Sequence, residues 1–190
     1  MTKDSIITLP NQHLRERSKK IGIITPDIRE LADNMIAATL DWEDSREHEL
    51  GVALAAIQVD KLLRLVVVRN DFDNKDDQSF QVFVNPEITK YEGEQIEDLE
   101  GCLSVPDIYG KVLRYEKIRL KALTLEGKQI RISLDGFIAR ILQHEIDHTN
   151  GIVFIDHIKD SQEAFFKLNK SGELESLDYE KNIRENSILW

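Results

Sequence analysis

The chain has 190 residues, 41% of them hydrophobic, and a formal net charge of −10 at pH 7. This composition predicts a single domain, residues 1–190, and argues against direct DNA binding, because phosphate contacts need clustered Lys and Arg. No apolar run approaches the roughly 18 residues of a membrane span and no signal peptide is recognisable, so we expect a cytoplasmic protein.

Several elements follow from local pattern, in chain order. Residues 25–45 read as a helix, with Thr25 as cap and Pro26 in its first turn. Residues 62–70 form a β-branched run typical of a buried strand, and the polar residues 71–79 a surface loop. One or two strands are predicted within 81–106 and a hairpin within 117–133.

The C-terminal part carries fewer signals. From about residue 156 we expect a helix that includes the sequence AFFKL (164–168), followed by a frayed tail. Both are read as appendages of the one domain, not as a second domain.

The sequence QHEIDHTNG (143–151) suggests a metal site. In a helix running from about Asp135 to Gly151, His144 and His148 lie one turn apart and could share an ion, with Glu145 beside it to handle protons. The competing interpretation is a pair of structural histidines held by hydrogen bonds. Zinc proteases with an extended motif take a third histidine where this chain has Phe154.

The third metal ligand stays open on spacing alone. His157 follows nine residues after His148, in what reads as a surface loop, and Glu163 is the nearest later glutamate. Cys102 is the single cysteine. A lone cysteine is most often a small buried residue, yet thiolate is a strong ligand for zinc and ferrous iron.

Three motifs resemble those of the peptide deformylase family: GVALAAIQ (51–58), EGCLS (100–104) and QHEIDH (143–148). The resemblance runs from about residue 14 to 156 and implies an α+β fold, with antiparallel strands packed around a central HExxH helix. It also implies an enzyme that removes the formyl group from N-terminal formyl-methionine of nascent polypeptides and releases formate. The implied cofactor is one Fe²⁺ per chain, with Zn²⁺, Ni²⁺ or Co²⁺ as other occupants.

By this resemblance, Cys102 completes the metal site with His144 and His148, and Glu145 carries protons. The oxyanion donors would be the Leu103 backbone N–H and the Gln58 side-chain amide.

The implied substrate cleft combines the motif resemblance with the helix pattern. Phe137 and Ile141 share the ligand-bearing face of the helix, and ordinary core packing is the alternative for both. Backbone groups near the first motif would pair with the peptide. The predicted substrate-binding residues are Gly51, Val52, Ala53, Glu100, Gly101, Phe137 and Ile141. Arg114 is predicted to order the ligands by pairing with Asp147 or Glu100, with a plain surface salt bridge as the alternative.

One departure from the family pattern bears on activity: Ala53 stands where the first motif has glycine. It favours an alternative in which the protein binds peptide N-termini with reduced or lost catalysis. A second alternative is an HExxH zinc endopeptidase, which would leave Cys102 without a role. The implied partners are formyl-methionyl peptides and, as in some family members, a transient ribosome contact, although this tail is not basic.

Overall fold

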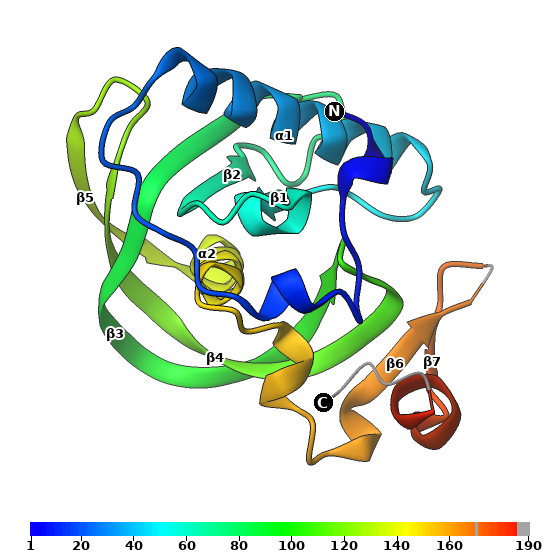
Figure 1. Cartoon of the computed structure of the whole chain (residues 1–190). Helices are drawn as coiled ribbons and strands as arrows, with labels where there is room; N and C mark the ends of the chain where they lie inside the picture. The colour runs from blue at the N-terminus through cyan, green and yellow to red at the C-terminus, as the bar shows by residue number, and fades with distance from the viewer. Residues whose placement is uncertain (170, 186–190) are drawn as a thin grey trace.

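A computed structural model describes residues 1–169 and 171–185, and the fold is α+β, as predicted (Figure 1). Two α-helices accompany one antiparallel sheet of seven strands in the described part of the chain. Their bounds are α1 Pro26–Asp44, β1 Ala53–Ala55, β2 Leu65–Arg69, β3 Phe80–Cys102, β4 Val105–Leu123, β5 Gln129–Asp135, α2 Gly136–Thr149, β6 Phe165–Leu168 and β7 Leu174–Ser176. No helix within these described ranges is long and apolar enough to cross a membrane.

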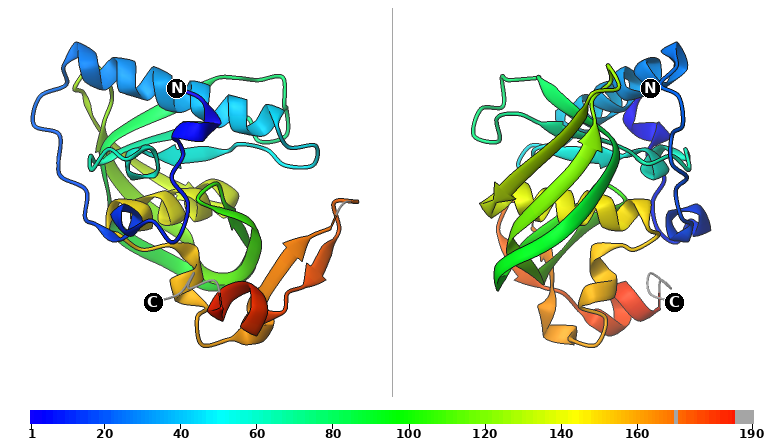
Figure 2. Two further views of the ribbon diagram at one scale, coloured as in Figure 1. Left: turned by 45° about the vertical axis from the view of Figure 1, so that its right-hand side comes forward. Right: turned by 90° about the vertical axis from the view of Figure 1, so that its left-hand side faces the viewer.

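The sheet runs in the order β1-β2-β3-β4-β6-β7, and β5 also pairs with β4. β2 is buried along its whole length because both of its faces are covered. Leu65 and Val67 pack into the core cluster that contains the apolar face of α1, whereas Val66 and Val68 pack into the cluster that contains α2. A strand covered on both faces reads as a continuous apolar run, which is the pattern seen in the sequence. Figure 2 shows α1 and α2 on opposite sides of this region.

Two hydrogen bonds between α2 and β4 help to hold this helix against the sheet. The side-chain amide of Gln143 in α2 donates to the Tyr115 carbonyl at 2.9 Å and accepts from its N–H at 3.1 Å. These bonds satisfy both polar atoms of the Gln143 amide, which is why a glutamine is tolerated on the buried side of α2.

Most predicted elements are confirmed. α1 begins after Thr25 with Pro26 in its first turn, and β4 and β5 form the predicted hairpin, whose turn contains Gly127 at φ +77°. Where one or two strands were expected, within 81–106, the structure has β3 and the start of β4.

The prediction for the C-terminal segment is wrong over AFFKL. Residues 162–164 form a short 3-10 turn, and Phe165–Leu168 is the strand β6, which pairs with residues 108–110 of β4. The pairing buries Phe165 (1% exposed) in a third core cluster, which a short helix would not do as well. β7 and a five-residue π-helix, Glu180–Arg184, follow, and the end of the expected tail (186–190) lies outside the described residues.

Candidate metal centre and substrate cleft

Three side chains that could hold a metal ion meet between β3 and α2. His144 and His148 lie one turn apart on α2, with their Nε2 atoms 3.2 Å from each other. Cys102 ends β3, and its Sγ atom lies 3.2 Å from Nε2 of His148. All three ligand atoms lie within 4.8 Å of one another. In the described part of the chain, neither His157 nor Glu163 belongs to such a group.

The spacing of these atoms suits a metal ion. Ligand atoms bound at about 2.0–2.3 Å in a tetrahedron lie roughly 3.3–3.6 Å apart, close to the separations seen. The Nδ1 atom of His144 is hydrogen-bonded to Glu100 at 2.9 Å, so that in the neutral imidazole, the form that binds a metal, the Nε2 lone pair faces the cluster. The Nε2 atom of His148 lies 3.2 Å from both the His144 nitrogen and the Cys102 sulfur, and such a cluster is best satisfied by a shared cation.

Glu145 points into the same site without a partner for one of its oxygens. It is 4% exposed, and its Oε2 atom has no hydrogen-bond partner among the described residues. Burial raises the pKa of this carboxyl to about 7; the charge on His144 opposes the rise and that on Glu100 adds to it. A buried acid with a pKa near neutrality can both accept and release a proton.

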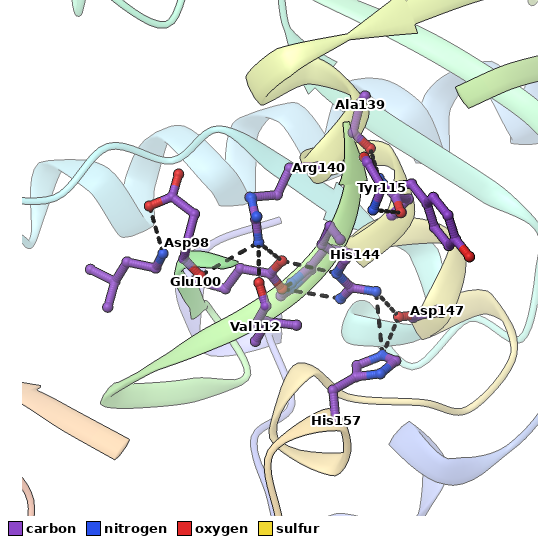
Figure 3. Close-up of polar contacts among 12 residues, drawn as sticks. Asp98, Glu100, Val112, Tyr115, Ala139, Arg140, His144, Asp147 and His157 are labelled. Atoms are coloured by element: carbon purple, nitrogen blue, oxygen red, sulfur yellow. Dashed lines mark hydrogen bonds and ion pairs between the residues drawn. The ribbon is translucent and has the colours of Figure 1, made fainter. Parts of the chain in front are cut away.

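The carboxylate of Glu100 is the centre of a buried polar network (Figure 3). Besides His144, it accepts from Nε and Nη2 of Arg114 at 2.9 and 3.1 Å and from Nη1 of Arg140 at 2.9 Å. Burial opposes its charge, but the hydrogen bonds from His144 and Arg114 outweigh that effect and hold the pKa of Glu100 well below its usual range. Glu100 therefore orients a candidate metal ligand, in addition to the substrate contact and the pairing with Arg114 that were predicted from the sequence.

Arg114 pairs with both carboxylates named from the sequence. Its Nη1 also donates to Asp147 at 2.5 Å, and Asp147 accepts from Nε2 of His157 at 2.7 Å (Figure 3). At 6% exposure Arg114 is not part of a plain surface salt bridge. His157, weighed above as a ligand, instead extends this network toward the surface.

Arg140 is a residue that the sequence argument missed. It donates to Glu100 and to three backbone carbonyls, those of Ile96 (2.6 Å), Val112 (2.8 Å) and Asp98 (3.5 Å). These bonds attach α2 to both long strands. The available signal was a charge one turn before His144 on the buried side of the helix, a position that requires a partner.

Gln58 lies beside the candidate metal ligands, in the short 3-10 turn Ala56–Val59. Its Oε1 accepts from the Ala55 N–H at 2.8 Å, so the amide NH₂ group points toward the site. That group donates to Ser104 Oγ at 3.1 Å and contacts Cys102 Sγ at 3.5 Å. Ser104, fully buried, was not singled out from the sequence although it closes the second motif.

A cavity of about 110 Å³ opens beside these groups. Phe137 is half exposed at its rim, where its ring meets that of Phe72 edge-on at 5.2 Å, and Ile141 is buried. The cavity is lined by residues of the first motif, of β3 and the position just after it, and of α2: Val52, Ala53, Gln58, Leu99, Glu100, Gly101, Cys102, Leu103, Phe137, Arg140, Ile141, His144 and Glu145.

Gly51 is the predicted substrate-binding residue that does not line this cavity. It is buried, its N–H donates to Glu43 at 2.9 Å, and its carbonyl accepts from Arg69 at 3.2 Å. With both polar backbone groups engaged internally, Gly51 is not available to pair with a peptide. Ala53 lies in β1 and is not among the residues with positive φ, so a methyl group at this position carries no backbone strain.

A thiolate, two imidazoles and a buried glutamate beside an apolar cavity define a metal-dependent hydrolase site. The family model described as polypeptide deformylase matches residues 3–164. The chain belongs to this family, whose members are metallohydrolases.

Named relatives agree with this assignment. A peptide deformylase of Rhodopseudomonas palustris is 38% identical over 167 residues, which cover 86% of this chain and 90% of that protein. Another, of Rhodopirellula baltica, is 38% identical over 184 residues and covers 97% of this chain and 86% of its own length.

Two solved structures extend the likeness to the fold. The peptide deformylase of Legionella pneumophila is 39% identical, with a TM-score of 0.71 over 80% of this chain and 83% of its own. That of Synechococcus elongatus, solved in complex with actinonin, is 26% identical, with a TM-score of 0.76 over 97% of this chain and 88% of its own.

Proposed function

We propose that this enzyme removes the formyl group from N-terminal formyl-methionine of nascent polypeptides, with Fe²⁺ held by Cys102, His144 and His148. Zn²⁺, Ni²⁺ and Co²⁺ also accept nitrogen and sulfur ligands and are the alternative occupants. The observation that carries the proposal is the convergence of these three ligand atoms beside Glu145 at the wall of an apolar cavity.

The reaction breaks the formyl C–N bond and adds water across it. A metal ion held by these ligands would act as a Lewis acid and make hydroxide available near neutral pH. Glu145 takes a proton from the attacking water and delivers it to the departing nitrogen, so that formate and a free N-terminal amine result. The positive charge of the metal would lower the pKa of Glu145 from the value near 7 set by burial and so favour its role as base.

Charge that develops on the formyl oxygen needs donors. The Leu103 N–H and the Gln58 amide are the donors we propose, since both residues line the cavity. Gln58 is already oriented through its Oε1 and would exchange its bond with Ser104 for one with the substrate. An uncharged donor stabilises the oxyanion without competing for the proton held by Glu145.

The substrate would lie along the free edge of β1. The Arg69 N–H donates to the Val52 carbonyl at 2.8 Å, which makes these residues a hydrogen-bonded pair of the antiparallel ladder. The N–H and C=O of Ala53, next along the strand, therefore point away from β2. We propose that they pair with the peptide backbone while Val52, Phe137 and Ile141 enclose the methionine side chain.

The wider setting is also proposed. Residues 1–190 would form one deformylase-like domain in which the antiparallel strands surround the HExxH helix, α2. We propose a cytoplasmic location and formyl-methionyl nascent peptides as partners. A transient ribosome contact would have to use a surface other than a basic C-terminal helix.

The test is a formate-release assay on protein purified without oxygen, with metal analysis of the same sample. Formyl-Met-Ala-Ser should be deformylated, about one metal ion per chain should be found, and actinonin should bind. Peptide binding without formate release would support a non-catalytic peptide-binding protein. Cleavage inside an unmodified peptide would support an endopeptidase. Either result would overturn the proposed activity.

A further inference from the structure

A buried ion pair lies beyond the residues discussed so far as catalytic. Glu43, near the end of α1, and Arg69, the last residue of β2, meet with Oε2 and Nη2 at 2.5 Å, and their side chains are 4% and 0% exposed. Removing two charges from water costs about as much as their attraction returns, so such a pair is weak evidence for stability alone. Its other contacts point to a more specific role.

The pair holds the start of the edge strand β1. Glu43 accepts from the Gly51 N–H at 2.9 Å, and Nε of Arg69 donates to the Gly51 carbonyl at 3.2 Å. Gly51 also lies directly against α1. A Cβ atom there would come within 2.7 Å of Thr39 Cγ2 and 2.8 Å of the Thr39 carbonyl oxygen. The backbone two residues before Ala53 is therefore fixed by hydrogen bonds and by close packing.

The same arginine holds the loop that follows β2. Its Nη1 atom donates to the carbonyl oxygens of Asp77 at 2.7 Å and Lys75 at 3.2 Å. This loop carries Phe72, whose ring packs edge-on against Phe137 at the rim of the cavity. Arg69 thus connects the proposed peptide-binding edge to the aromatic contact at the cavity rim.

Neither Glu43 nor Arg69 lines the cavity, so any effect on substrate must pass through the segments that they hold. A guanidinium suits this task because its planar fork reaches several acceptors at once, which an ammonium cannot do. Displacement of reacting groups by about 1 Å can cost on the order of 100-fold in rate. An anchor two residues before Ala53 is close enough to control such a displacement.

We propose that Glu43 and Arg69 are positioning residues for deformylation, which fix the edge of β1 and the 71–79 loop in the arrangement that receives the peptide. The inference rests on the proposed function, because it assumes that a formylated peptide pairs with β1. The inference predicts that loss of the Glu43–Arg69 pair lowers kcat/KM for substrates with a longer peptide backbone and leaves metal binding intact.

The experiment compares a short and a long substrate, formyl-Met-amide and formyl-Met-Ala-Ala-amide. The variants are Glu43→Gln, Arg69→Met and Arg69→Lys, all assayed with bound metal measured. In the unaltered enzyme the long substrate should have the higher kcat/KM. In each variant the ratio of kcat/KM for the long substrate to that for the short one should fall at least about tenfold. Arg69→Lys should not restore this ratio, because an ammonium group keeps the charge but lacks the planar fork of the guanidinium.

The matched control is Arg29→Gln, which removes an exposed ion pair from the same helix, with Arg29 and Glu126 3.7 Å apart. It should keep the full gain. A folded, metal-loaded Glu43→Gln or Arg69→Lys enzyme that also keeps the full gain would overturn the inference. These two conservative variants carry the test if Arg69→Met does not fold.

Hydrogen exchange separates this inference from the proposed function. The variants should exchange amide protons faster than the unaltered protein in segments 50–55 and 71–79, but not in α2. If the unaltered enzyme releases no formate from either substrate, the proposed function fails, and hydrogen exchange alone then tests whether Glu43 and Arg69 fix the two segments. Unchanged exchange in both segments of the variants would refute the proposed positioning role.

Discussion

The carboxylate of Glu100 offers a sharp test of how the metal centre is held. It accepts four hydrogen bonds, two from Arg114 and one each from Arg140 and His144, all between 2.9 and 3.1 Å. Glu100→Gln keeps the shape but replaces one acceptor oxygen by an NH₂ group that faces other donors. Both guanidinium groups then remain buried without their shared counter-charge.

The expected cost follows from this geometry. Removing one partner from a buried ion pair destabilises by about 3–5 kcal/mol, and loss of the group that orients a metal-ligating histidine lowers metal affinity by about 10–100-fold. Urea unfolding of the metal-free protein measures the first quantity, and competition with a metal chelator measures the second.

Glu92→Gln is the matched control. Glu92 lies on the same strand and accepts from Nε and Nη2 of Arg119 at 2.7 and 3.0 Å, but it lies on the surface. The hydrogen bonds from Arg119 and Lys90 lower the pKa of Glu92 to about 2, yet solvent screens these partly exposed groups, and the substitution should leave metal affinity unchanged. If both variants behave alike, burial of the network around Glu100 does not control the site.

The same network predicts a pH dependence. The pKa of Glu100 is lowered from its ordinary 4.5 in the folded protein, so the unfolded chain binds more protons in acid. Its contribution to stability is complete above about pH 4.5 and is lost as the pH falls through the folded-state pKa. Metal-free Glu100→Gln should therefore lose less stability between about pH 5 and 2 than the unaltered protein. Parallel curves would refute the reasoning.

Three further substitutions test the residues of the site. Cys102→Ser should lose most bound metal and activity, because a hydroxyl is a poor ligand for these ions; full retention of both would show that the third ligand is another group. Glu145→Ala should keep its metal while formate release falls by about 10²–10⁴-fold, and equal loss of both would make Glu145 structural. Ala53→Gly should keep activity on formyl-Met peptides, since Ala53 has no positive φ, but lower the free energy of unfolding by about 1 kcal/mol. If the natural chain released no formate and Ala53→Gly did, this prediction would be contradicted.

Local pattern was enough to predict several elements and part of the site. Helix α1 follows from helical spacing after Pro26, β2 from a β-branched run, and the shared face of His144 and His148 from their separation of four residues. These features depend on contacts between close neighbours in the chain, which the 3.6-residue and 2-residue periods describe directly. Assignment to the family rested on three motifs and agrees with the family match.

Short apolar segments and buried charges needed the tertiary structure. The segment AFFKL is too short for periodicity to separate helix from strand, and the choice was decided by pairing with β4, more than 50 residues earlier in the chain. Arg140 looks like a misplaced charge in the sequence. Only the folded β3–β4 ribbon supplies the carboxylate and carbonyls that satisfy it.

The candidate metal centre depends on both local and long-range contacts. The two histidines are a local feature of one helix, whereas Cys102 lies 46 positions before His148 and reaches it only through the register of β3 and the packing of α2. The hydrogen bond from Arg69, at the end of β2, to Gly51, in the segment before β1, likewise joins residues that are far apart in the sequence. Spacing along a helix is set by backbone geometry alone, but contacts between distant segments are set by which buried polar groups find partners when the sheet and helices pack.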